Sequence, residues 1–227
     1  MGIIVITNIA LAWRTFISNK RHPTNIFFAL TALMIAFWTV GVSSFQQPQF
    51  SVLNGILVRI CYAGAALIAP VFFLFSYYLG YPIFPLKRWH TLTLIVSFFL
   101  MLVIIILPNV FLAWPVPQDI YLKPEINLFW HIVFAVYFTT IMLLAFFILF
   151  LKYRKMDGIW RKRVKQCFIA TFVAFIGGSI FSLIFPLVKD HSFSWLGPVF
   201  TLFMAAYIWY HIFWVPGRAP KHHSTDH

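Results

Sequence analysis

The chain reads, from Leu128 to Lys165, LFWHIVFAVYFTTIMLLAFFILFLKYRKMDGIWRKRVK. The first 24 of these residues carry no charged side chain apart from one titratable histidine, and the last 14 hold seven lysines and arginines. About 20 apolar residues in a helix cross a hydrocarbon core about 30 Å thick. Lysine and arginine collect in the cytoplasmic turns that follow such helices. This stretch therefore predicts a transmembrane helix that ends in a basic cytoplasmic turn.

The composition indicates that lipid surrounds most of the chain. Of the 227 residues, 62% are hydrophobic and 10% are charged, whereas a soluble domain has about 25% charged residues. The polar residues are too few to cover a surface that faces water, so the chain needs another solvent. The formal net charge of +12 would suggest nucleic acid in a soluble domain. In a membrane protein the topology explains this charge, and we expect no nucleic-acid partner.

Seven apolar runs predict an all-α, polytopic fold, a bundle of seven transmembrane helices. The runs are roughly Gly2–Ile17, Ile26–Phe45, Val52–Leu79, Trp89–Leu107, Leu128–Leu151, Val164–Leu187 and Phe193–Val215. The first run is the weakest of them, because it is short and holds Arg14 near its inner end. We expect the bundle to occupy residues 1–215 and a short cytoplasmic tail to occupy residues 216–227.

The basic residues predict the orientation of the bundle. Of the 17 lysines and arginines, 14 fall near the first, third and fifth connections or in the tail, and only Arg59, Lys123 and Lys189 fall on the other side. By the positive-inside rule, the amino end lies outside and the carboxyl end lies in the cytoplasm. We expect a multi-pass protein of the cell membrane, the inner or plasma membrane. The alternation holds at each loop, and a wrong helix count would break it.

The chain lacks residues that several classes of membrane protein need for their function. No aspartate or glutamate lies inside an apolar run, although proton-coupled transporters and pumps keep a titratable group at depth. No lysine lies in the seventh run, which excludes a retinal Schiff base there. The two cysteines, Cys61 and Cys167, are expected near opposite faces of the bilayer and are interpreted as small packing residues. We find no metal-ligand set and no catalytic motif, so we expect the protein not to be an enzyme.

The histidines are candidate ligands for a haem. A haem held between helices needs two imidazoles at matching depth on facing helices. His90 and His211 both fall near the cytoplasmic end, whereas His131 falls near the outer face without a matching partner. A histidine at the membrane interface is commoner than a haem ligand. We therefore expect no cofactor.

Four residues of the outer half form the candidate ligand site: Trp38, Arg59, Tyr62 and His131. Arg59 is expected close to the outer edge of the hydrocarbon, where it either anchors an anionic group or extends into the headgroups. The aromatic residues either line an outer cavity or belong to the core and the interfacial belt. Both interpretations stay open at this point.

Small residues gather in the third run at Ala63–Ala66 and in the sixth run at Gly177–Ser179 and Ser182. Such residues let helix backbones approach closely, so they are interpreted as packing positions. Pro70 and the Gly197–Pro198 pair are either hinges or kinks of the kind that membrane helices tolerate.

Five segments resemble, in the same order, the seven-helix amino-terminal sensor region of bacterial and archaeal histidine kinases. They are Lys20–Ser43 (KRHPTNIFFALTALMIAFWTVGVS), Leu57–Leu79 (LVRICYAGAALIAPVFFLFSYYL), Arg161–Gln166 (RKRVKQ), Phe185–Pro186 and Trp195–Thr201 (WLGPVFT). The first is similar to a basic-basic-x-Pro-x-Asn turn followed by a helix with a central Trp-x-x-Gly. The second is similar to a helix with an arginine, a small-residue patch and Pro-x-x-Phe. These are packing and turn motifs, and none is catalytic.

The resemblance implies an input module, because in that family the seven-helix region is joined to a kinase, cyclase or phosphatase output. The ligand of the region is mostly undefined. Two departures from the family matter. Only about ten residues follow the last run, so we expect no output domain. Tyr210 is flanked by Trp209 and His211, whereas family members often have basic residues there.

The leading hypothesis is a non-enzymatic membrane sensor or ligand-binding module that holds a small or lipid-like molecule near Arg59, Tyr62, Trp38 and His131. Its expected partners are membrane lipid and a membrane or cytoplasmic signalling protein that contacts the basic turn at Lys152–Lys165. The alternative is an accessory subunit of a larger membrane complex, respiratory or photosynthetic. A haem-bearing electron carrier is the third hypothesis.

Overall fold

A computed structural model shows a helical protein and describes residues 1–45, 54–107, 110–112, 126–185 and 193–214. The helices are α1 (Gly2–Ser18), α2 (Pro23–Phe45), α3 (Asn54–Tyr78), α4 (Arg88–Ile106), α5 (Leu128–Lys155), α6 (Gly158–Ser179) and α8 (Leu196–Trp209). Helix α6 continues into the π-helical segment η2 (Ile180–Ile184), and α8 continues into η3 (Tyr210–Trp214). Over these residues the only β-type pairing is an isolated bridge between Leu112 and Ile126. The expected tail at residues 216–227 lies outside the described residues.

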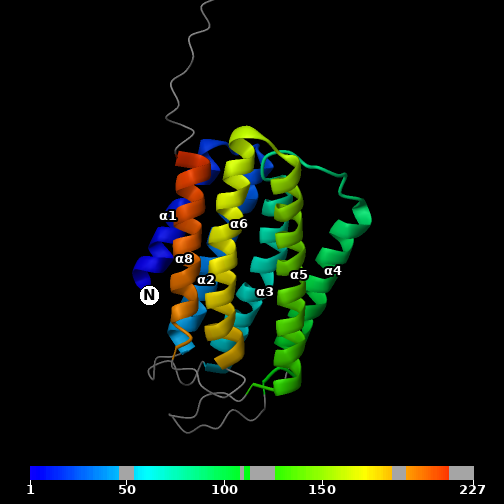
Figure 1. The fold of residues 1–227 in the computed structure, drawn as a ribbon. Helices are drawn as coiled ribbons and strands as arrows, with labels where there is room; N and C mark the ends of the chain where they lie inside the picture. Colours follow the sequence, from blue (N-terminus) through cyan, green and yellow to red (C-terminus); the bar gives the residue numbers. More distant parts are fainter. Residues whose placement is uncertain (46–53, 108–109, 113–125, 186–192, 215–227) are drawn as a thin grey trace, which may run out of the picture.

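Six helices are long and apolar enough to cross a membrane, which confirms the all-helical prediction and indicates a multi-pass membrane protein. They are α2, α3, α4, α5, the α6–η2 helix and the α8–η3 helix. Helix α1 is the exception: its 17 residues extend about 25 Å at 1.5 Å per residue. It begins partway along the bundle (Figure 1). The first apolar run is therefore a helix, as expected, but a short one.

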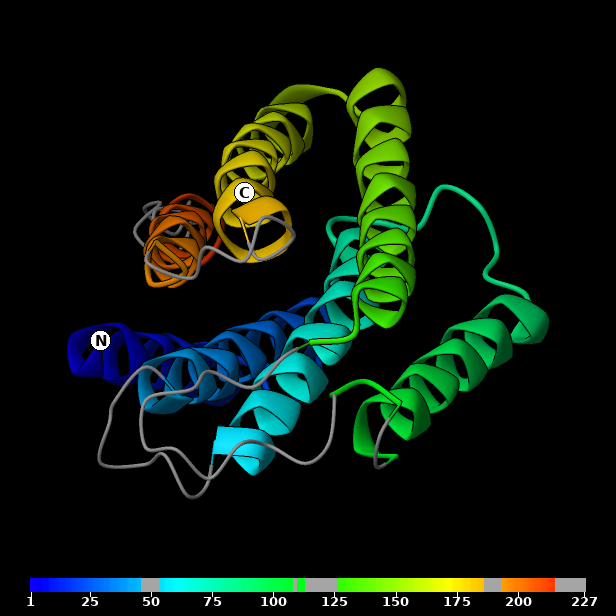
Figure 2. The same ribbon diagram turned by 90° about the horizontal axis from the view of Figure 1, so that it is seen from below.

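Six helices form a closed ring. Helices α1, α2, α3, α5, α6 and α8 each pack against the next one, and α8 packs back against α1 (Figure 2). Helix α4 lies outside the ring and packs mainly against α3. The described α1–α2, α3–α4 and α5–α6 turns all lie at one end of the bundle (Figure 1), which we call the basic end. The opposite end is called the far end.

Glycine brings α2 and α3 together. A Cβ atom on Gly41 would lie 2.8 Å from the Cα and the Cβ of Cys61, and one on Gly64 would lie 2.9 Å from Cδ1 of Phe37. At Gly41 only a hydrogen atom fits, whereas at Gly64 an added Cβ atom would press on the ring of Phe37. Gly64 therefore acts as a packing position between α2 and α3.

The end of α3 is tied to α5 and α2 by side chains. Lys152 Nζ donates hydrogen bonds to the carbonyl oxygens of Tyr77 at 2.5 Å and Leu79 at 2.6 Å. The Thr24 hydroxyl donates to the carbonyl oxygen of Tyr78 at 2.7 Å. Carbonyls at the end of a helix lack intrahelical donors and carry the negative end of the helix dipole. Lys152, which is 0% exposed, is therefore a capping group as well as one of the basic residues that mark this end.

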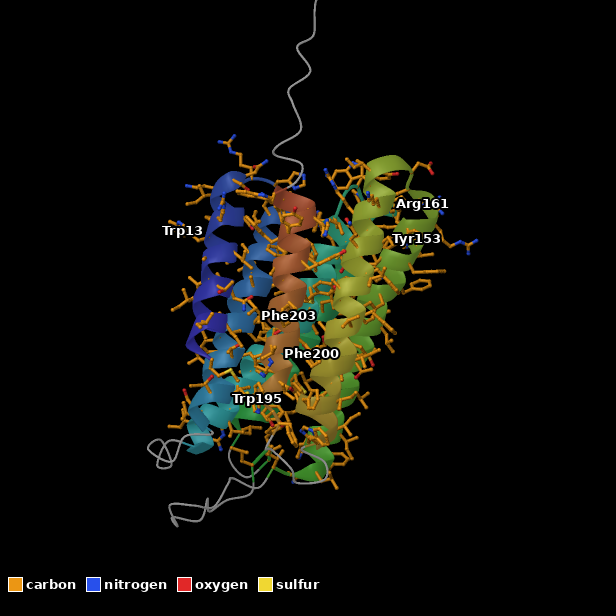
Figure 3. All side chains as sticks on the ribbon, turned by 60° about the vertical axis from the view of Figure 1, so that its left-hand side comes forward. Trp13, Tyr153, Arg161, Trp195, Phe200 and Phe203 are labelled. Carbon is orange, nitrogen blue, oxygen red and sulfur yellow. The ribbon has the colours of Figure 1, made fainter. Side chains whose placement is uncertain are left out.

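Several arginines of the basic end lie over aromatic rings. The guanidinium of Arg161 lies 4.9 Å from the ring centre of Tyr153, and both side chains lie together at this end (Figure 3). Arg163 lies 4.7 Å from the ring of Trp160. Arg14, the charged residue within the first apolar run, lies 4.4 Å from the ring centre of Trp214 in η3. Such contacts stabilise a cation at the border between lipid and water.

Candidate functional site

A cavity of about 110 Å³ lies inside the ring. Its wall is built by α2, α3, α5, α8 and the α6–η2 helix, so each helix of the ring except α1 contributes to it. The residues that line it range from Val58 and Ser194, near the far end, to Thr171 of α6 and Phe72 of α3, which lies closer to the basic end. Among the described residues, no lysine, arginine, histidine, aspartate or glutamate lines it.

Most of the wall is apolar. Trp38 on α2, Tyr62 on α3, Phe134 on α5 and Phe175 on α6 present rings to the cavity, and Met204 of α8 lies among them. Ligand pockets in proteins are commonly of this type, with aromatic and aliphatic walls and a few polar groups that orient the ligand.

The polar part of the wall is a group of three serines, which we call the serine patch: Ser179, Ser182 and Ser194. Their Oγ atoms are buried and have no hydrogen-bond partner in the described part of the chain. Thr171 and Thr201 also line the cavity, but they donate to main-chain carbonyls of their own helices at 2.8 and 2.9 Å. The three serine hydroxyls are thus buried groups of the wall that lack a partner among the described residues.

A hydrogen-bonded chain links three helices beside the cavity. Tyr62 Oη lies 3.0 Å from His131 Nδ1, and His131 Nε2 lies 3.0 Å from the carbonyl oxygen of Leu183 in η2. A carbonyl oxygen only accepts, so Nε2 carries the hydrogen, and in the neutral imidazole Nδ1 accepts from the tyrosine hydroxyl. The chain therefore joins α3 to α5 and α5 to the π-helical segment of α6.

Helices α2, η2 and α8 meet at one point of the wall. A Cβ atom on Gly197 would collide with the Ser182 hydroxyl and would lie 3.0 Å from Cη2 of Trp38. Ser194 precedes Gly197 by three residues and lies just before α8. Ser182 therefore lies at the contact between η2 and α8, close to the indole of Trp38.

The structure places the four predicted site residues differently. Trp38 and Tyr62 line the cavity, and His131, which is 2% exposed, lies behind Tyr62 and is bonded to it. Arg59 is half-buried, is not part of the wall, and its Nε has no hydrogen-bond partner in the parts of the chain that are described. Asp119 and Glu125, the acidic residues of the adjoining outer connection, lie outside the described residues.

The sequence alone does not mark the serine patch as part of a site. Ser179 and Ser182 belong to a run of small residues whose common role in membrane helices is packing, and Ser194 precedes the last helix without any motif. What distinguishes these serines is that their hydroxyls lack an acceptor. Whether an acceptor is present depends on the π-helical backbone of residues 180–184 and on the neighbouring helices.

The haem hypothesis receives no support from the geometry. His90 is exposed on α4, outside the ring, whereas His211 lies in η3, and α4 packs mainly against α3. His211 lies 3.2 Å from the Gln166 side-chain nitrogen. Both ring nitrogens of His131 are already in hydrogen-bond contact. Across the described ranges, no three histidine, cysteine or acidic residues gather as a metal would require.

The chain from Tyr62 to Leu183 can be tested by Tyr62→Phe, which removes the hydroxyl that donates to His131. We expect the melting temperature in detergent to fall by about 2–4 °C, since one buried hydrogen bond contributes about 1 kcal/mol. Tyr210→Phe is the control, because Tyr210 is 49% exposed. Scanning fluorimetry measures both. A Tyr62→Phe protein as stable as the control would show that this bond stabilises nothing.

Comparison with known proteins gave no match: no protein-family model fits the chain, and no curated protein or solved structure is significantly similar to it.

Proposed function

We propose that the protein is a non-enzymatic membrane sensor or ligand-binding module that holds a small molecule inside its ring of helices. The observation that carries this proposal is the cavity, with its apolar wall and its three unpartnered serine hydroxyls. Buried hydroxyls without partners cost free energy, so a site that keeps three of them is suited to a ligand that satisfies them. The resemblance to the sensor region of histidine kinases agrees with this role.

The same proposal includes a topology. Helix α1 is the seventh span of the cell membrane, the amino end lies outside, and the basic end faces the cytoplasm. The support is the positive-inside rule, since Lys155, Arg161 and Lys162 gather at that end. The short α1 crosses with local thinning of the bilayer and with Arg14 at the headgroups. Reaction of an impermeant reagent with a cysteine placed at Lys155 in intact cells would contradict this orientation.

The signal would pass along the helices that form the wall. A ligand that contacts the α6–η2 helix and α8 changes how these helices pack against α3 and α5. Helix α6 begins at the basic turn, and α8 ends beside it. A membrane or cytoplasmic signalling partner would recognise the cations of this turn. Such a route needs only two packing arrangements that the ligand stabilises differently.

Filling the cavity tests the proposal. Gly178 lines it, and a Cβ atom there would meet nothing within 4 Å, so Gly178→Leu places a side chain into open space. A thermal-shift screen of metabolites in detergent should find compounds that stabilise the wild type, and this variant should lose their binding. Val173→Leu on the same helix is the control, because Val173 is 54% exposed. A screen without hits, or hits that bind Gly178→Leu unchanged, would remove the cavity as the site.

A second candidate function, the accessory subunit, is favoured by α4. This helix lies outside the ring and exposes a row of apolar side chains along its length. They are Leu92, Ile95, Val96, Phe99, Leu100, Val103 and Ile106. A partner of a larger respiratory or photosynthetic complex would pack there in place of lipid. Native mass measurement after gentle solubilisation separates the two functions, because a sensor of this type is recovered without respiratory or photosynthetic subunits.

A further inference from the structure

The cavity and its polar groups together define a class of ligand, and this inference rests on the proposed function. We propose that the cavity binds a small, uncharged molecule with an apolar body of about six heavy atoms and one hydroxyl or carbonyl oxygen, which the serine patch holds. The size, charge and polarity of the cavity each restrict the ligand.

The volume of the cavity restricts the size of the ligand. A cavity of about 110 Å³ is somewhat smaller than the engineered apolar cavity of about 150 Å³ that binds benzene or xenon. The occupant is therefore about as large as a five- or six-membered ring.

The side chains of the wall restrict the charge of the ligand. No charged or histidine side chain lines the cavity within the described ranges, and burying an ion without a counter-charge costs a large free energy. Arg59, for which an anionic ligand was one of two interpretations, lies outside the wall. An uncharged ligand is the type that this wall accepts.

The position of the oxygen follows from the serine patch. In an α-helix, serine hydroxyls commonly donate to a carbonyl three or four residues earlier, but Ser179 and Ser182 have no such bond, and Ser182 lies in the wider turn of η2. Ser194 is 5% exposed and has an equally unpartnered hydroxyl. A serine hydroxyl both donates and accepts, so the patch can bind a carbonyl or a hydroxyl.

Three probes separate the ligand class from the cavity itself: xenon, cyclopentanol and pentanoate. Xenon is apolar and reports an accessible cavity, as measured by ¹²⁹Xe chemical shift on the protein in nanodiscs. Cyclopentanol carries the proposed ring and hydroxyl, and pentanoate is an anion of similar size. We expect xenon and cyclopentanol to bind the wild type and pentanoate not to bind. Gly178→Leu should abolish both interactions.

The triple variant Ser179→Ala, Ser182→Ala, Ser194→Ala tests the serine patch. We expect it to bind xenon as the wild type does and to bind cyclopentanol about tenfold more weakly, because hydrogen bonds to the hydroxyls are lost. Arg59→Ala is the control and should bind cyclopentanol with unchanged affinity. Preserved xenon binding also shows that the triple variant is folded.

The outcomes distinguish the two proposals. One outcome is that xenon binds and that cyclopentanol binds the wild type and the triple variant with equal affinity. In that case the serine patch holds water only and the proposed ligand class is wrong, but the cavity remains the site. If pentanoate binds and Arg59→Ala removes it, the ligand is an anion and this inference is overturned. If xenon does not bind the wild type, the cavity is closed and the proposed function fails with it.

Discussion

Replacing Lys152 by methionine is expected to lower the melting temperature of the detergent-solubilised protein by about 6–12 °C, which corresponds to about 3 kcal/mol for a chain of this size. The ammonium donates to the carbonyl oxygens of Tyr77 and Leu79 at the end of α3. Methionine fills nearly the same volume but donates nothing, so two buried carbonyls lose their partner. Removing a buried charge recovers part of the desolvation cost, which limits the loss.

Lys155→Met is the matched control for this prediction. Lys155 lies three residues further along α5 and is exposed, so its replacement should change the melting temperature by less than about 2 °C. Scanning calorimetry or fluorimetry of both variants in the same detergent measures the difference. Equal melting temperatures for the two variants would mean that Lys152 acts only as one more cytoplasmic charge.

The second large effect concerns Gly41. We expect Gly41→Ala to lower the melting temperature by about 4–8 °C, because the added methyl group would lie 2.8 Å from the Cα and Cβ of Cys61, and overpacking typically costs about 1–3 kcal/mol. The neighbouring atoms belong to the backbone of α3 and the base of a side chain. They cannot rotate away, so α2 and α3 must separate.

Gly178→Ala is the matched control for Gly41→Ala. Both glycines lie inside membrane helices, but a Cβ atom at Gly178 meets nothing within 4 Å. Alanine favours the helix by about 1 kcal/mol over glycine, so this variant should be as stable as the wild type or slightly more stable. A Gly41→Ala protein that matches Gly178→Ala in melting temperature would show that α2 and α3 are free to move apart here.

Hydropathy predicted the helices of the fold. The runs beginning at Ile26, Val52, Trp89, Leu128, Val164 and Phe193 all contain helices of spanning length. The first run is a helix of 17 residues, and whether it spans depends on how the bilayer adapts to it, which no residue pattern contains. The position of α4 outside the ring was also not predictable, because its apolar run resembles those of the ring helices.

The candidate site was predicted in part. Trp38 and Tyr62 line the cavity and His131 lies beside it, and residue type and depth are the features that point to them. Arg59 is the outer-half cation within an apolar run, and depth alone does not tell whether its side chain enters the cavity. Of the serine patch, the sequence predicts Ser179 and Ser182 as packing residues and does not single out Ser194, because a sequence does not show which hydroxyls lack an acceptor.

The sequence by itself determined the solvent of this protein and its helical structure, because transfer into lipid and the need to satisfy every backbone group apply to each run of residues separately. Only the tertiary structure decided the partners of the polar side chains within the helices. Lys152 bonds a residue 75 positions away, and Tyr62 bonds one 69 positions away. The free energy of such a group depends on the atom opposite it, and the packing of the helices selects that atom.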